Sequence, residues 1–226
     1  MLVIGHRGAA GHKPENTLSS FQKALELGVD MVEFDVYVCR SGEVVVIHDD
    51  RLERTTNGSG YVVEKNFQEL RQLDAGDSEK IPLLEEVLDL CAGKTKVNIE
   101  LKGLHTAEAV WLVLEKYLKQ GKFQEEDFLI SSFDHFELKK FQNFNPQIKL
   151  GALLEGIPLS LAQFGEDVGA YSVNLSLDFV NKEIIDDAHK RGLKVFVWTV
   201  NHPEDFRKMK NLGVDGVFSD YPERMK

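Results

Sequence analysis

The chain has few cysteines, no long apolar run and no excess of positive charge. Its 226 residues include only Cys39 and Cys91 as cysteines. The two could form one disulfide, but reduced, buried thiols of a cytoplasmic protein are the favoured interpretation. No apolar run reaches the roughly 18 to 20 residues that a membrane-spanning helix needs, which predicts no stable insertion into a membrane. The formal net charge of −10 argues against a broad nucleic-acid-binding surface.

The N-terminus lacks the charged segment, apolar segment and cleavage site of a secretory signal, so we expect a cytoplasmic location. No linker or low-complexity segment divides the chain, and the pattern predicts a single domain over residues 1–226. It indicates no particular oligomeric state.

Short apolar stretches rich in β-branched residues alternate with segments of helical period. Strands are expected at residues 2–6, 31–38, 43–48, 96–102, 128–132, 148–154, 170–175, 194–199 and 214–219. Helices are expected at residues 17–27, 83–91, 105–119, 134–143, 159–165, 181–191 and 203–211. This alternation predicts an α/β fold in which helices connect parallel strands.

The stretches 31–38 and 43–48 must form an antiparallel hairpin, because the segment CRSGE between them is too short for a parallel crossover. A two-residue turn at Ser41-Gly42 would place His48 opposite Asp35. Eight parallel strands remain, which predicts a (βα)₈ TIM barrel. The alternative, a doubly wound open sheet, lacks a glycine-rich phosphate fingerprint after its first strand.

Residues 49–80 interrupt the pattern with polar and turn-forming residues. We expect them to form a small insertion after the hairpin, placed over the mouth that the C-terminal ends of the barrel strands form. Connecting segments of this length are more often functional lids than filler.

Polar residues gather where the expected strands end, which is where barrel enzymes place their chemistry. The candidates are His6 and Arg7 after the first strand, Glu33 and Asp35 in the second, His48 at the end of the hairpin, and Asn98, Glu100 and Lys102 in residues 96–102. Single residues of this kind are common without a function. When all of these polar residues point into a closed barrel, a function is the better explanation, because buried unpaired charges are costly. Gly5 and Gly8 are interpreted as room for a substrate beside the backbone.

The carboxylates of Glu33, Asp35 and Glu100, with no cysteine among them, form a site of hard oxygen ligands. Such a site is suited to one divalent metal ion, Mg²⁺ or Ca²⁺. Set against Arg7 and Lys102, the carboxylates leave one excess negative charge, which would repel an anion. A divalent cation reverses that sign and favours a phosphodiester. Two histidines beside such a centre can divide the proton transfers between the attacking hydroxyl and the leaving oxygen.

The motifs HRG, PENT, EFDV, VVVIHD, NIELK, VFVWTVN and GVDGVFSDYP resemble those of the glycerophosphodiester phosphodiesterases, in the same order and spacing over residues 3–222. The resemblance implies a barrel related to phosphoinositide-specific phospholipase C. It also implies hydrolysis of small-molecule glycerophosphodiesters, such as glycerophosphocholine or glycerophosphoethanolamine, to an alcohol and sn-glycerol 3-phosphate.

The resemblance also implies roles for individual residues. His6 and His48 match the acid/base pair, and Glu33, Asp35 and Glu100 match the metal ligands. Arg7 and Lys102 match phosphate contacts, and Glu15 and Asn16 match a supporting loop. From their positions at strand ends, Trp198 is expected to form an apolar wall at the mouth and Phe133 to cover the glycerol.

Three alternatives stay open. Lysophospholipase D or sphingomyelinase D-like hydrolysis would need an apolar mouth, whereas the segment RLERTTNGSGYVVEKN is mostly polar and favours a water-soluble substrate. A non-catalytic metabolite-binding barrel would be expected to lack a histidine or a metal ligand. A sugar-phosphate aldolase or isomerase leaves the paired histidines unexplained.

Overall fold

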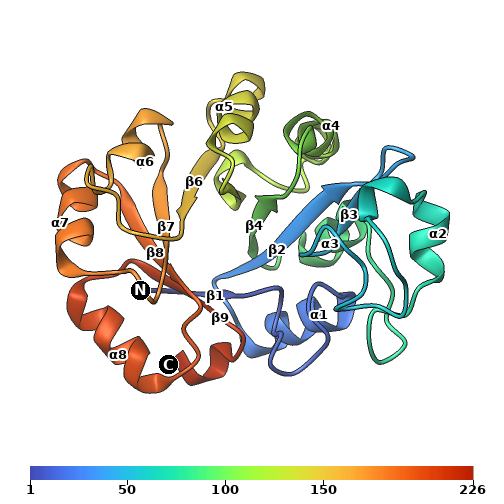
Figure 1. Ribbon diagram of the computed structural model, residues 1–226, viewed down its shortest axis with the longest axis horizontal. Helices are drawn as coiled ribbons and strands as arrows, with labels where there is room; N and C mark the ends of the chain where they lie inside the picture. The colour runs from blue at the N-terminus through green and yellow to red at the C-terminus, as the bar shows by residue number, and fades with distance from the viewer. Residues whose placement is uncertain (226) are drawn as a thin grey trace.

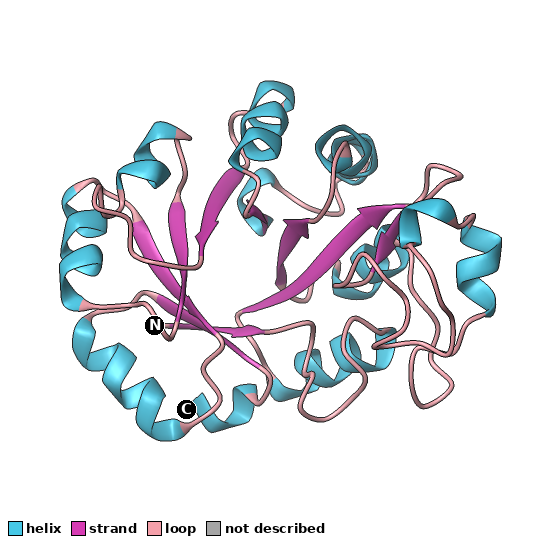
Figure 2. Ribbon diagram, viewed as in Figure 1, coloured by secondary structure: helices cyan, strands magenta, loops and turns pink. Residues whose placement is uncertain are grey.

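Eight parallel strands close into a barrel, and a ninth strand lies antiparallel on the second. The computed structural model describes residues 1–225. Hydrogen-bonded neighbours follow the order β1-β9-β8-β7-β6-β5-β4-β2-β3, and β1 also pairs with β2, which closes the ring. Helices surround the sheet on its outside (Figures 1 and 2). The predicted (βα)₈ TIM barrel is confirmed.

The strands span Leu2–Gly5 (β1), Met31–Val38 (β2), Val44–Val46 (β3), Lys96–Leu101 (β4), Phe128–Ser132 (β5), Lys149–Leu154 (β6), Ser172–Ser176 (β7), Lys194–Trp198 (β8) and Gly216–Ser219 (β9). The α-helices span Leu18–Leu27 (α1), Phe67–Gln72 (α2), Leu84–Cys91 (α3), Thr106–Lys119 (α4), His135–Phe144 (α5), Gln163–Asp167 (α6), Lys182–Lys190 (α7) and Pro203–Leu212 (α8). Short 3₁₀ turns lie at Val62–Glu64, Glu125–Asp127 and Pro222–Met225. Within residues 1–225, no helix combines the length and apolar character needed to cross a membrane.

The helix expected over residues 159–165 begins later than predicted and is shorter. It spans Gln163–Asp167. Leu161 has a φ of 50°, a left-handed conformation that an L-residue cannot adopt inside an α-helix. The segment before Gln163 therefore belongs to the β6–α6 loop.

The two faces of β2 and β4 have opposite chemistry. Val32, Phe34 and Val36 of β2 are fully buried against the surrounding helices, and the ring of Phe34 lies edge-on to that of Phe21 in α1 at 5.5 Å. The intervening carboxylates, Glu33 and Asp35, point the other way, because successive side chains of a strand alternate between faces. The same alternation in β4 turns its polar residues into the barrel.

Apolar side chains also fill the bottom of the barrel interior. Ile4, Met31, Leu129, Phe196 and Phe218 form one buried cluster there. The polar residues of β2 and β4 therefore lie at the mouth end, above an apolar plug. Cys91 packs in the main core and Cys39 in a separate cluster beside the hairpin, and both are free thiols.

The β2–β3 hairpin has a different register from the predicted one. Val36 lies opposite Val46, and the loop is one residue longer than expected. The backbone N–H of Cys39 donates to Glu43 O at 3.0 Å, that of Gly42 donates to Cys39 O at 2.9 Å, and Gly42 has a φ of 98°. This is the three-residue loop in which a type I turn is followed by a left-handed glycine.

The register shift makes the predicted pairing of His48 with Asp35 wrong. The residue opposite Asp35 is Ile47, whose N–H donates to Asp35 O at 3.0 Å. A shift of one residue exchanges the two faces of a strand, so Ile47 points into an apolar cluster. His48 still reaches the mouth, because β3 ends at Val46 and the following residues leave the strand.

Apolar residues of the segment 49–80 pack with the hairpin in a cluster that is separate from the main core. The cluster joins Tyr37, Cys39, Val45 and Ile47 of the hairpin to Leu52, Val62, Leu70, Ala75 and Ile81. In Figure 1, α2 and its loops lie at the outer side of the barrel next to β3 rather than across the mouth. The expectation of a lid is therefore wrong for α2, because the apolar residues of the segment draw it onto the hairpin.

Candidate active site

A cavity of ≈ 60 Å³ opens at the C-terminal ends of the barrel strands. Its lining consists of His6, Arg7, Glu33, His48, Glu100, Lys102, Ser131, Phe133, Leu153, Trp198 and Phe218. Four of the candidates lie outside this lining, and they are Asp35, Asn98, Glu15 and Asn16. Asp35 is buried between Glu33 and Glu100, and Glu15 and Asn16 support the site from the loop after β1.

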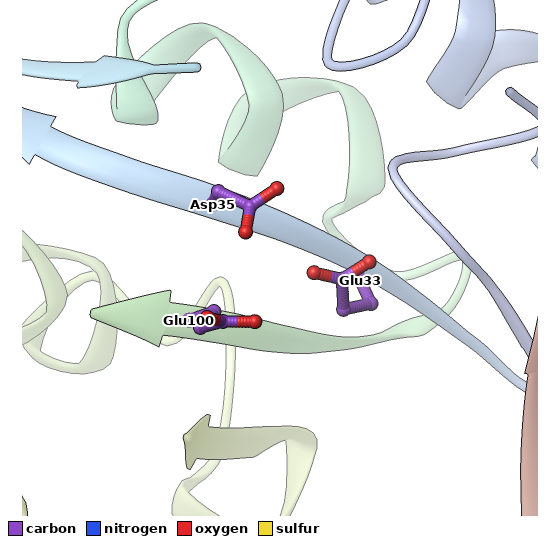
Figure 3. A group of neighbouring side chains, drawn as sticks. All are labelled: Glu33, Asp35 and Glu100. Atoms are coloured by element: carbon purple, nitrogen blue, oxygen red, sulfur yellow. The ribbon is translucent and has the colours of Figure 1, made fainter. Parts of the chain in front are cut away.

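Glu33, Asp35 and Glu100 form a compact carboxylate cluster (Figure 3). One oxygen from each lies within 4.8 Å of the others, and Asp35 pairs directly with Glu100 across β2 and β4. All three side chains are almost completely buried. Burial, together with the neighbouring carboxylates, raises the pKa of Glu33 well above its usual value and that of Glu100 to about 7.

The composition of this cluster fits a divalent cation. All the donors are hard oxygens, which Mg²⁺ and Ca²⁺ prefer. The raised pKa values reflect first the burial of the carboxylates and then their mutual repulsion, and a cation among them would stabilise the charged forms. Asn16 orients the central carboxylate, since its Nδ2 donates to Asp35 Oδ2 at 2.9 Å. The three residues can therefore hold one metal ion.

Arg7 and Lys102 bring positive charge to opposite sides of the cluster. Lys102 Nζ donates to Glu100 Oε1 at 2.9 Å and lies 3.8 Å from Asp35 Oδ1. Arg7 Nε lies 3.6 Å from Asp35 Oδ2, but it is buried and has no hydrogen-bond partner. Burial alone would lower the pKa of both cations, but the surrounding carboxylates raise it. Both side chains remain charged and line the cavity.

The loop after β1 has a tight backbone that its two glycines allow. A Cβ on Gly5 would lie 2.4 Å from Gly8 O, and one on Gly8 would lie 2.4 Å from Ser20 Oγ. Gly8 also has a φ of 90°. The chain's own backbone and α1 therefore occupy this space, and the interpretation of these glycines as room for a substrate is wrong. The tight loop instead lets the N–H of Arg7 donate to Glu33 Oε2 at 2.8 Å.

His6 is held by a residue from the opposite end of the sequence. Its Nδ1 lies 2.7 Å from Asp220 Oδ1, just after β9. Asn201 Nδ2 in turn donates to Asp220 Oδ2 at 2.7 Å. These contacts direct Nε2 of His6 away from Asp220. Asp220 has no role in the sequence-based prediction, although its position directly after the last strand is the signal that could have identified it.

Because the sequence-based prediction assigns proton transfer to His6, replacing Asp220 with asparagine is expected to lower kcat by about 10- to 100-fold, the size of effect that a small misplacement of a reacting group has. An amide can donate to Nδ1 of His6 as well as accept from it, so it no longer selects one orientation and tautomer of the ring. Steady-state kinetics and thermal unfolding of the variant check this. An unchanged kcat would contradict the positioning role of Asp220.

His48 has the same kind of support from its neighbour in the chain. Its Nδ1 lies 2.5 Å from Asp49 Oδ1, and its Nε2 lies 3.4 Å from Lys102 Nζ. Burial lowers the pKa of His48, which favours the neutral ring at pH 7. The sequence-based prediction missed Asp49 as a functional residue, although it directly follows His48 in the VVVIHD motif.

Two aromatic side chains, Phe133 and Trp198, form one wall of the cavity. The rings of Phe133 and Trp198 meet edge to face with centroids 5.7 Å apart. Trp198 Nε1 donates to Asn174 O at 3.2 Å, which fixes the indole, whereas Phe133 is 44% exposed. Lys102 Nζ lies 5.7 Å from the centre of the Phe133 ring, so the apolar wall adjoins the charged part of the cavity.

Comparisons with known proteins all indicate the same protein family. The model of the glycerophosphoryl diester phosphodiesterase family matches residues 6–224. A glycerophosphodiester phosphodiesterase of Caldanaerobacter subterraneus subsp. tengcongensis is 38% identical over 99% of this chain and 96% of the relative. Lysophospholipase D GDPD1 of Homo sapiens is 26% identical over 99% of this chain and 84% of the relative.

Solved structures show the same likeness. A phosphodiesterase of Oleispira antarctica, solved in complex with its product sn-glycerol-3-phosphate, superposes with a TM-score of 0.92 at 34% identity. The superposition covers 100% of this chain and 95% of that one. Similarity over the whole length means that the barrel and its loops are compared together, and not the barrel alone.

Proposed function

Since the chain belongs to the glycerophosphoryl diester phosphodiesterase family and is a phosphoric diester hydrolase of that class, we propose that it hydrolyses glycerophosphocholine and similar water-soluble glycerophosphodiesters to an alcohol and sn-glycerol 3-phosphate. The proposal includes one divalent metal ion and a pair of catalytic histidines. The main support for the proposal is one cavity that the two histidines, Arg7, Lys102 and two carboxylates of the cluster line together. Asp35, the third carboxylate of the cluster, does not line the cavity but lies next to the other two.

The metal ion is proposed to be bound by Glu33, Asp35 and Glu100. When bound, such an ion supplies Lewis-acid stabilisation of negative charge on phosphate oxygens. The cluster accommodates either Mg²⁺ or Ca²⁺, because both take carboxylate oxygens. Arg7 and Lys102 lie beside the cluster, and they are proposed to orient the phosphodiester and to stabilise the charge that develops on it.

The two histidines are proposed to transfer the protons. His48, with its lowered pKa, is neutral at pH 7 and can accept a proton from the hydroxyl group that attacks phosphorus. His6, directed by Asp220, then donates a proton to the leaving oxygen. The aspartates hold both rings by Nδ1, which leaves Nε2 of His6 for the substrate, whereas a substrate that bonds to Nε2 of His48 has to replace the contact of that atom with Lys102 Nζ. Glu15 accepts a hydrogen bond from Arg7 and Asn16 donates one to Asp35, and neither of the two lines the cavity.

The wild-type protein, supplied with Mg²⁺ or Ca²⁺, is expected to convert glycerophosphocholine to choline and sn-glycerol 3-phosphate. Enzyme-coupled detection of both products measures the reaction. The proposal requires cleavage on the choline side of phosphorus. Release of phosphocholine and free glycerol would contradict it.

A second candidate substrate is a lysophospholipid. Bulky apolar side chains are exposed on the loops and helix starts that follow four neighbouring strands, β4 to β7. They are Leu104, Phe133, Phe136, Ile157, Leu159 and Phe179. Phe133 belongs to the aromatic wall, and the others follow strands at the same end of the barrel, where apolar side chains are suited to contact an acyl chain. The polar segment that favoured a soluble substrate lies beside β3, on another part of the rim.

The two substrate classes can be separated with one variant. Replacing Leu159, whose side chain is completely exposed, by serine should lower kcat/KM for lysophosphatidylcholine and leave that for glycerophosphocholine unchanged if the apolar rim binds acyl chains. Equal kcat/KM values of wild type and variant on lysophosphatidylcholine would remove this second candidate. A cytoplasmic location also remains our prediction, as does the absence of nucleic-acid partners, which the net charge of −10 supports.

A further inference from the structure

Arg54, from the segment 49–80, connects two carboxylates at the edge of the active site. Its Nε donates to Asp49 Oδ2 at 2.6 Å, and its Nη1 donates to Glu15 Oε2 at 2.8 Å. Its Nη2 donates to both residues, at 2.9 Å to Asp49 Oδ1 and at 2.8 Å to Glu15 Oε1. One guanidinium therefore makes a two-point contact with each of two carboxylates, a geometry that the planar fork of arginine permits.

Each of these carboxylates also holds a residue of the proposed mechanism. Asp49 Oδ1 lies 2.5 Å from Nδ1 of His48, and Glu15 Oε1 accepts from Arg7 Nη1 at 2.7 Å. The two oxygens that Nη2 of Arg54 contacts are therefore the same oxygens that contact His48 and Arg7. Arg54 does not line the cavity, and its side chain is 47% exposed.

We propose that Arg54 is a positioning residue, which aligns His48 through Asp49 and Arg7 through Glu15. This inference rests on the proposed roles of His48 and Arg7. Without Arg54, the carboxylates of Asp49 and Glu15 would face each other with no cation between them. Each would then be free to turn, and His48 and Arg7 would lose their fixed orientation. The segment 49–80 thus serves the site from the side of the barrel, although α2 does not cover the mouth.

Replacing Arg54 with glutamine tests this inference. We expect kcat on the preferred glycerophosphodiester to fall by about 10- to 100-fold, because displacements near 1 Å of a catalytic group have effects of this size. KM is expected to rise, since Arg7 is a proposed phosphate contact. Arg54→Lys should resemble Arg54→Gln more than the wild type, because an ammonium group cannot contact both carboxylates at two points.

Arg51 provides a matched control. It lies in the same segment, its side chain is 48% exposed, and within residues 1–225 its only carboxylate partner at ion-pair distance is Glu53. Its guanidinium stacks over Tyr61 at 4.7 Å, away from the cavity. Arg51→Gln should leave kcat and KM within about twofold of wild type, the size of effect usual for exposed ion pairs. Equal kinetics of Arg54→Gln and Arg51→Gln would overturn the inference.

Two further measurements separate positioning from a general loss of stability and from failure of the proposed function. In a double-mutant cycle with Asp49→Asn, the effects on kcat should be strongly non-additive, because both changes act through His48. Calorimetry with sn-glycerol 3-phosphate should show weaker binding to Arg54→Gln at an unchanged thermal midpoint, independently of turnover. Unaltered product binding, or a kinetic loss matched by loss of folded protein, would overturn the inference even if the wild type is active.

Discussion

Replacing either His6 or His48 with alanine is expected to lower kcat by about 10²- to 10⁴-fold, the usual contribution of a positioned acid or base. The two variants are expected to fold, because neither side chain belongs to the apolar clusters and both line the open cavity. The effect should appear in kcat more than in KM, since Arg7 and Lys102 remain to bind the phosphate. Steady-state kinetics with thermal unfolding curves measure both properties.

His189 is the matched control for this experiment. Its Nε2 lies 2.9 Å from Asp215 Oδ2, so it too is a histidine paired with an aspartate, but it lies in α7 outside the cavity. His189→Ala should retain near wild-type kcat. If His6→Ala or His48→Ala retained it as well, the acid/base assignment of that histidine would be wrong.

Replacing Glu100 with glutamine is expected to weaken the binding of Mg²⁺ or Ca²⁺ by at least about 100-fold, more than the loss of a supporting contact to a metal ligand costs. The change removes one of three oxygens that lie within 4.8 Å of one another. It also removes a buried carboxyl whose pKa is raised to about 7 by burial and by Asp35. The metal-free variant should therefore fold at least as readily as the metal-free wild type.

Calorimetric titration with each ion and thermal unfolding without metal measure these two effects. Glu115→Gln on α4 is a suitable control, because Glu115 pairs with Lys119 on the surface. An excess of chelator should abolish activity of the wild type, and added Mg²⁺ or Ca²⁺ should restore it. Full activity in the chelator would contradict the metal site, and an unfolded Glu100→Gln variant would indicate a structural carboxylate instead.

The barrel and the centre of its site could be predicted from local patterns in the sequence. The alternation of strands and helices predicts the closed sheet, because the spacing of apolar residues along each strand or helix specifies which of its faces is buried. The spacing of Glu33 and Asp35 by two residues, repeated in Asn98 and Glu100, places both pairs on one face of neighbouring strands. The structure places these residues as predicted.

The hairpin register could not be predicted in the same way. A two-residue and a three-residue loop around Gly42 both agree with the residue types in CRSGE, yet they differ by one position in every pair. The hydrogen bond from Cys39 N to Glu43 O selects the longer loop, and the packing of Ile47 against the segment 49–80 agrees with it. That segment is not adjacent in the sheet, so strand periodicity contains no information about it.

The sequence by itself determined the fold class, the convergence of the carboxylates and the position of His6 at the mouth, because these follow from periodicity and from the common edge of parallel strands. Only the tertiary structure decided which partners hold the two histidines and how Arg54 joins them. His6 meets Asp220 across 214 positions of the chain, and Arg54 meets Glu15 across 39. Contacts between loops depend on how every intervening element closes the barrel, and no local pattern specifies that geometry.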